Sequence, residues 1–196
     1  MTTPHTFRAS RLFNTLILFC ALQPPAPAQT AAPPAQGAKG PNRPCMQRAE
    51  YRQFDFWVGE WDAYGPRGRK GGTSVVERFA DGCGILENWT GALGGSGKSI
   101  NFYDPRAGRW FQYWIGADGN PQRFSGTYED GALRYEGEPF TRGGRRFVTR
   151  LTFFDVDANT VRQLSEQSGD GGKTWSTVYD LKYVRRGHAG AAPPNH

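Results

Sequence analysis

The sequence predicts an all-β domain, an antiparallel up-and-down β-barrel of about ten strands with a short helical turn in front of it. Short strand-like runs follow one another through most of the chain. The segments between them carry pairs such as Asp81-Gly82, Gly94-Gly95 and Asp130-Gly131, which supply the positive φ values of hairpin turns. No run sustains helical periodicity, and closing such a meander into a barrel removes its unpaired edges.

Ten runs are predicted strands, and the segment Tyr51–Val58 in front of them is the helix candidate. The predicted strands are Trp61–Tyr64, Thr73–Phe79, Gly84–Thr90, Lys98–Tyr103, Arg109–Gly116, Gln122–Tyr128, Ala132–Glu138, Arg145–Phe154, Thr160–Gln167 and Ser176–Arg185. A two-sheet sandwich is the alternative arrangement of the same strands.

The aromatic segment Phe54–Trp61 favours the barrel over the sandwich. Its sequence is FDFWVGEW, and a Gly-x-Trp at the entrance to the first strand resembles the start of lipocalin-like (calycin) barrels. In such barrels the Trp closes one end, and a basic residue of the last strand lies over its ring. Arg185 or Arg186 would take that position here and stabilise the ring by a cation–π contact.

The first residues of the chain predict export. Residues 1–28 have the features of a signal peptide, because two arginines precede the apolar stretch Leu12–Leu22 and Ala26-Pro27-Ala28 offers small residues for cleavage. The alternative of a transmembrane anchor is disfavoured, since this stretch is too short to cross ~30 Å of hydrocarbon. A lipoprotein anchor at Cys20 lacks the small residues expected before it. We therefore expect a periplasmic or secreted bacterial protein with no stable membrane insertion after cleavage.

The remaining chain divides into one folded domain and two flanking segments. Residues 29–44 are rich in Ala, Pro, Gly and Gln and have too few apolar side chains to offset the entropy of ordering. They are predicted to be a disordered linker, and residues 187–196 a disordered tail. Residues 45–186 form the predicted barrel domain.

Two cysteines remain once Cys20 is cleaved with the signal peptide. In an oxidising compartment, Cys45 and Cys83 are expected to form a disulfide. Two separate thiols are the alternative.

Charge and histidine content exclude several classes of function. Loss of Arg8 and Arg11 lowers the net charge from +6 to +4, and the remaining basic residues are spread through turns. Nucleic-acid binding is therefore not expected. No histidine lies in the predicted domain, which argues against His-dependent triads and zinc sites, and no cofactor or metal is expected. Haem ligation by Tyr183 or His188 is the remaining alternative.

Several motifs together resemble an uncharacterised family of bacterial secreted proteins with a calycin-like domain of unknown function. These motifs are QFDFWVGEW at 53–61, Gly82-Cys83, Glu87-x-Trp89-x-Gly91, Asn101-Phe102-Tyr103-Asp104, Trp110-x-Gln112-x-Trp114, Val161-Arg162-Gln163 and SGDGGKTW at 168–175. The resemblance covers about residues 45–186 and implies a lipocalin-like barrel with no established activity. The last motif also fits the Asp-box pattern of sialidases, where it is a structural hairpin device, and Asp170 is expected to cap the turn.

Alternation along the strands brings polar and aromatic residues to shared faces. Tryptophans should be buried, and residues two positions away in a strand point to the same side. The candidate ligand-binding residues are Glu87, Trp89, Asn101, Tyr103, Gln112, Trp114 and Gln163. Apolar walls with a few convergent polar groups are typical of a small-molecule pocket. A filled core made of the same residues, or polar side chains facing solvent, are the alternatives.

The expected function is non-catalytic binding of a small apolar or aromatic molecule in the barrel lumen. A structural or interaction module of the cell envelope, with a filled core, is the first alternative. The second is an enzyme in which Glu87 acts as base and Tyr103 as acid. An open lumen would favour ligand binding or catalysis, whereas a lumen filled by aromatic rings would favour the structural module.

Overall fold

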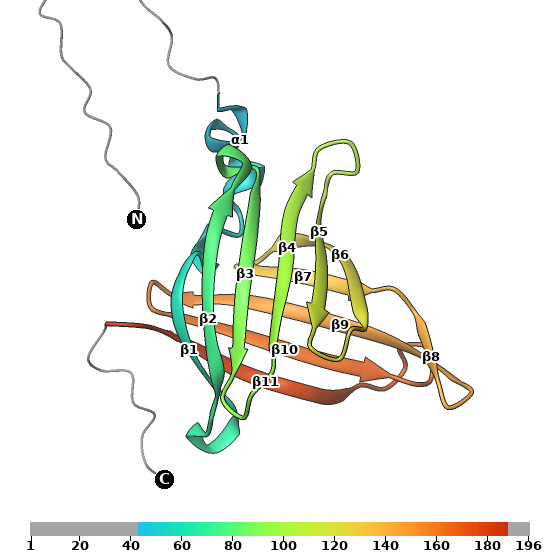
Figure 1. Cartoon of the computed structure of the whole chain (residues 1–196). Coiled ribbons are helices and arrows are strands. Elements are labelled where there is room, and N and C mark those ends of the chain that lie inside the picture. The colour runs from blue at the N-terminus through green and yellow to red at the C-terminus, as the bar shows by residue number, and fades with distance from the viewer. Residues whose placement is uncertain (1–42, 188–196) are drawn as a thin grey trace, which may run out of the picture. The chain divides into compact units, whose positions relative to one another are not determined.

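The computed structural model describes residues 43–187, which form a closed β-barrel (Figure 1). The predicted signal peptide, nearly all of the predicted linker and all but the first residue of the predicted tail lie outside the described residues. The strands are β1 (Gly59–Tyr64), β2 (Lys70–Phe79), β3 (Gly84–Gly91), β4 (Ser96–Asp104), β5 (Arg109–Gly116), β6 (Pro121–Glu129), β7 (Ala132–Gly137), β8 (Phe140–Arg142), β9 (Arg145–Asp157), β10 (Thr160–Ser168) and β11 (Ser176–Arg185).

Ten of these strands close the barrel. Each strand from β1 to β6 pairs antiparallel with the next, and the ring continues through the pairs β7–β9, β9–β10 and β10–β11. β11 then pairs with β1, where Trp61 lies opposite Arg185. The ring confirms the predicted fold class and excludes the sandwich, in which the first and last strands would not meet.

The short strand β8 lies outside the ring. Its residues pair with β9 alone within the described chain, with Phe140 opposite Phe147. Sequence analysis missed this strand because three residues after Pro139 are too few to show alternation. In Figure 1, β8 and the start of β9 form a hairpin that projects from one end of the barrel.

The two ends of the barrel differ in what covers them. The hairpins β2–β3, β4–β5, β6–β7 and β9–β10 lie at the end where β1 begins, here called the closed end. The connections β1–β2, β3–β4, β5–β6 and β10–β11 lie at the opposite, open end, together with the β8 hairpin. Figure 1 shows the N-terminal helical segments beside the β2–β3 hairpin.

Short helical segments fill the closed end with aromatic rings. They are α1 (Pro44–Gln47), η1 (Ala49–Arg52) and η2 (Asp55–Trp57), where a single turn over Tyr51–Val58 was predicted. Phe54 and Trp57 are fully buried. Their ring centroids are 5.0 Å apart, and each lies within about 5 Å of the Phe153 ring in β9. Burial of these rings anchors the segment in the barrel.

Trp61 and Arg185 complete the closed end as predicted. The Arg185 guanidinium lies 4.2 Å from the centre of the buried Trp61 ring and donates to the carbonyl oxygens of Val58, at 3.1 Å, and Ala158, at 3.0 Å. Gly59 is required beside this contact. Its φ is +146°, and a Cβ at this position would collide with the Arg185 guanidinium.

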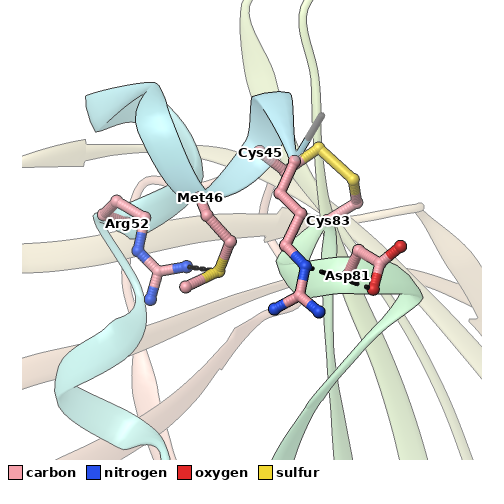
Figure 2. The surroundings of a disulfide bond; sticks show 6 residues. Cys45, Met46, Arg52, Asp81 and Cys83 are labelled. Carbon is pink, nitrogen blue, oxygen red and sulfur yellow. Dashed lines mark hydrogen bonds and ion pairs between the residues drawn. A yellow bond between two sulfur atoms is a disulfide. The ribbon is translucent and has the colours of Figure 1, made fainter. Parts of the chain in front are cut away.

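A disulfide ties the N-terminal segment to the barrel (Figure 2). It joins Cys45 in α1 to Cys83, which follows η4 (Ala80–Gly82) and immediately precedes β3. The Cα–Cα distance of 4.9 Å lies within the usual range, and the predicted pairing is confirmed. Beside it, Arg52 donates to the Met46 sulfur at 3.1 Å.

The Asp-box segment is the connection between β10 and β11. Asp170 accepts hydrogen bonds from the backbone N–H groups of Lys173 and Thr174, both at 3.0 Å, and from the Thr174 hydroxyl at 2.6 Å. The Ser168 hydroxyl also donates to Asp170, at 2.6 Å. Together these donors, with Ser168 contributing most, hold the pKa of Asp170 well below its usual range. Trp175 Nε1 donates to the Gly172 carbonyl at 3.1 Å. The motif therefore orders a turn, which is the structural role expected for it.

Candidate functional site

A cavity of about 330 Å³ occupies the lumen in the open half of the barrel. Its walls come from β2, β3, β5, β6, β9, β10 and β11. The lining residues are Gly71, Glu87, Trp89, Gln112, Trp114, Gln122, Phe124, Leu151, Gln163, Tyr179, Leu181 and Tyr183. The surface is thus mainly aromatic and aliphatic, with one carboxyl group and three side-chain amides.

Five of the seven predicted ligand-binding residues line this cavity. They are Glu87, Trp89, Gln112, Trp114 and Gln163. These residues come from β3, β5 and β10, no two of which pair with each other, so the five side chains approach the cavity from different parts of the ring. Alternation along each strand correctly placed them on the inner face.

Asn101 is fully buried one layer deeper and does not line the cavity. Its amide nitrogen donates to the Ser99 hydroxyl at 3.0 Å and to the Ile85 carbonyl at 3.3 Å. Its oxygen accepts from Gln112 Nε2 at 2.8 Å. Asn101 therefore holds Gln112 and Ser99 in place from the layer beneath the cavity.

Tyr103 lies towards the closed end, away from the cavity. Its ring packs on Tyr51, with centroids 5.4 Å apart, and on Trp110, at 6.1 Å. Glu87 pairs with Ser99, four residues along β4 from Tyr103, which corresponds to roughly 13 Å of strand. The proposed acid–base pair of Glu87 and Tyr103 is therefore not assembled.

Glu87 is the central polar group of the cavity wall. The residue is 3% exposed, and its carboxylate oxygens accept hydrogen bonds from Ser74 Oγ at 2.9 Å and Ser99 Oγ at 3.1 Å. Burial raises the pKa of Glu87 from its ordinary value of 4.5 to about 7, and the two serine hydroxyls oppose this shift without cancelling it. The side chain is therefore poised to change charge near neutral pH.

Glycines beneath two tryptophans keep the lumen open. A Cβ built on Gly72 in β2 would meet the six-membered ring of Trp89, and one built on Gly97 in β4 would meet that of Trp114. Each indole thus lies over a position without a side chain and packs along the wall. Any larger residue at these glycines would push the rings into the cavity.

Sequence reasoning missed seven lining residues, five of them on β6 and β11, where Gln122 accompanies Phe124 on β6. Tyr179, Leu181 and Tyr183 alternate along β11, and Phe124 lies on β6. The same period-2 alternation that found the others could have found these, but neither strand carries a tryptophan to mark its inner face. The sequence suggests only haem ligation as a role for Tyr183. It is buried, and its hydroxyl donates to Gln163 Oε1 at 2.8 Å, while His188 lies outside the described residues.

A second recess of about 620 Å³ lies outside the first at the open end. It shares Gln122, Phe124 and Tyr179 with the cavity and extends to the β5–β6 connection and to β8. The shared residues make it the vestibule of the cavity. A ligand entering from the open end would pass between the β8 hairpin and β11.

Comparison with known proteins assigns no family. Neither a protein-family model nor a curated protein matches the chain. Among residues 43–187, no helix is long and apolar enough to cross a membrane. In the same part of the chain, no three His, Cys, Asp or Glu side chains converge as metal ligands would.

The raised pKa of Glu87 predicts a specific pH dependence of stability. A carboxyl group whose pKa is higher in the folded state stabilises the fold in acid, and this contribution is lost as the pH rises from about 4.5 to about 7. The loss amounts to about 3 kcal/mol. Relative to wild type, the Glu87→Gln protein should therefore gain about 3 kcal/mol of unfolding free energy between about pH 4 and pH 8.

Urea unfolding at both pH values measures this difference, and other titrating groups cancel in the comparison. Glu77→Gln on the outer face of β2, an exposed position, is the matched control and should keep a constant difference from wild type. A Glu87→Gln difference that is equally constant with pH would contradict the buried, raised-pKa carboxyl.

Proposed function

We propose that this protein binds a small molecule with an apolar or aromatic body in the lumen of its barrel. One observation carries the proposal, the cavity of about 330 Å³ lined by Trp89, Trp114, Phe124 and Leu181 with a few polar groups among them. Both its volume and its lining are typical of ligand pockets. The Cys45–Cys83 disulfide fits an oxidising compartment, so we further propose that binding takes place outside the cytoplasm.

Packing favours binding over a purely structural role. Protein interiors are normally close-packed, so a barrel that serves only as a module would be expected to fill its interior. Here the closed end is filled by Phe54, Trp57 and Trp61, whereas the open half is not. Gly72 and Gly97 hold the indoles against the wall, which preserves space that larger residues would occupy.

Filling the cavity with a side chain tests the proposal. Leu181→Trp adds an indole to the cavity wall and should weaken binding of the neutral probe N-phenyl-1-naphthylamine at least about tenfold, because the probe and the new ring compete for one volume. A fluorescence titration of the probe measures the affinity.

Ile115→Trp is the matched control for this experiment. Ile115 lies on the outer face of β5 and is 51% exposed, so the added indole leaves the lumen unchanged and wild-type affinity is expected. Probe binding that is absent in wild type, or that is equal in Leu181→Trp and wild type, would refute lumen binding.

A further inference from the structure

Glu87 is the one ionisable carboxyl or basic side chain among the described residues that line the cavity. Its two partners, Ser74 and Ser99, are neutral hydroxyls. No Lys, Arg or His belongs to the lining, and Glu87 has no ion pair within residues 43–187. Burying a carboxylate without a counter-charge costs free energy, and a cation bound beside it would reduce this cost.

The aromatic rings around this carboxyl add to the negative character of the cavity. Trp89 follows Glu87 by two residues on the same face of β3, and its ring centroid is 6.2 Å from that of Tyr183. Trp114, Phe124 and Tyr179 complete the aromatic lining. The face of an aromatic ring attracts cations, most strongly when both are shielded from water.

No arginine of the described chain lies over one of these rings. The described chain contains eight contacts between an arginine and an aromatic ring, as at Arg185 over Trp61. None of the eight involves a ring that lines the cavity. In a chain with an excess of Lys and Arg over Asp and Glu, the lumen thus combines a carboxyl group with aromatic rings over which no arginine of the described chain lies.

We propose that the ligand of this cavity is a small organic cation, an amine or quaternary ammonium group attached to an aromatic or apolar body. Its charge lies beside the Glu87 carboxylate, and its body packs against Trp89, Trp114 and Leu181. This inference rests on the proposed function and specifies the chemical class that the lumen selects. Small anions are disfavoured by the same carboxylate.

Proton release should accompany binding of such a cation. The groups that face Glu87 are the hydroxyls of Ser74 and Ser99 and the phenols of Tyr179 and Tyr183, whose pKa values burial and the neighbouring carboxylate raise. Both phenols therefore stay neutral near pH 7. A bound positive charge stabilises the ionised carboxylate, so affinity for a permanent cation should rise with pH through the titration of Glu87.

A pair of probes with the same shape and different charge tests the inference on the full chain. Benzyltrimethylammonium carries a permanent positive charge, and neopentylbenzene has carbon in place of its nitrogen. Near pH 8 the wild-type protein should bind the cation at least about tenfold more tightly than the neutral isostere. Displacement of N-phenyl-1-naphthylamine at low ionic strength measures both affinities.

The charge of Glu87 should account for this preference. In Glu87→Gln the preference for the cation should fall at least about fivefold, to what the aromatic rings alone provide, and Glu77→Gln on the outer face of β2 should keep the wild-type preference. Equal affinities for the two probes in wild type would overturn the cation inference and leave lumen binding intact. A preference that is undiminished in Glu87→Gln would overturn the placement of the cation beside this carboxylate. Failure of N-phenyl-1-naphthylamine and both isosteres to bind would overturn the inference and the proposed function together.

Discussion

Trp61→Ala is expected to lower the free energy of unfolding by roughly 3–5 kcal/mol, the cost of emptying a large buried aromatic site. Trp61 is fully buried, and its Nε1 donates to the Trp57 carbonyl at 2.8 Å. Truncation removes this donor, leaves the carbonyl without it and takes away the ring on which Arg185 lies. Urea unfolding followed by far-UV circular dichroism measures the loss.

Trp175→Ala provides a matched control for the Trp61 experiment. Trp175 also lies beneath an arginine, with the Arg150 guanidinium 4.3 Å from its ring centre, but it lies in the β10–β11 connection and is only partly buried. Its truncation should cost clearly less, about 1–2 kcal/mol. Equal costs at the two sites would mean that the ring at the closed end is not part of the core.

Truncation of Arg185 tests whether the two partners share one contact. Arg185→Ala should cost less than Trp61→Ala, because the Arg185 side chain is only partly buried and its removal empties less of the core than removal of the fully buried ring. The double variant should cost less than the sum of the two single changes, since each change alone already removes the ring–guanidinium contact. Additive costs would show that this contact contributes nothing measurable.

The fold was predictable because its signals are local. Hairpin turns such as Asp130-Gly131 adopt the positive φ values that their residues favour, and strands between such turns pair with their neighbours in the chain. The closing contact between Trp61 and Arg185, which are far apart in the sequence, was reached only through the resemblance to lipocalin-like barrels. The sequence of β8 does not by itself predict a strand, because the strand forms only by pairing with β9.

The sequence predicts which side chains of the site face the lumen, but not at which level of the barrel they lie. Period-2 alternation states which side of a strand a residue occupies, and it correctly put Glu87 and Gln112 on the inside. It cannot state how far along the barrel axis the side chain lies. Tyr103 and Asn101 also point inward, but Tyr103 belongs to the layer packed by the N-terminal segment and Asn101 to the polar layer below the cavity.

The existence of a cavity depends on volumes that no single strand reveals. Whether a barrel of ten strands is hollow depends on the total volume of the inward-facing side chains in each layer. In the open half, Gly72 and Gly97 lower this total volume, and the indole rings of neighbouring strands pack over them. The sequence shows both glycines, but only the register between strands shows which tryptophan each one faces.

Removal of the disulfide should cost about 4 kcal/mol in the chain-entropy account of cross-links, because Cys45 and Cys83 close a loop of 38 residues. This loop contains the aromatic segment of the closed end and all of β1 and β2. The double variant Cys45→Ala/Cys83→Ala leaves no free thiol of the pair and isolates the effect of the bond.

The double variant and the wild-type protein in reductant should give the same unfolding curve, and that curve should be steeper in urea than that of the oxidised protein, because an unfolded chain without the cross-link exposes more surface. Affinity for N-phenyl-1-naphthylamine is the internal control. The disulfide lies beside the closed end, whereas the cavity lies in the open half. Binding of the probe to the folded protein should therefore not change. A stability unaffected by reductant would mean that the N-terminal segment is held by Phe54 and Trp57 alone, with the cross-link adding nothing to their burial.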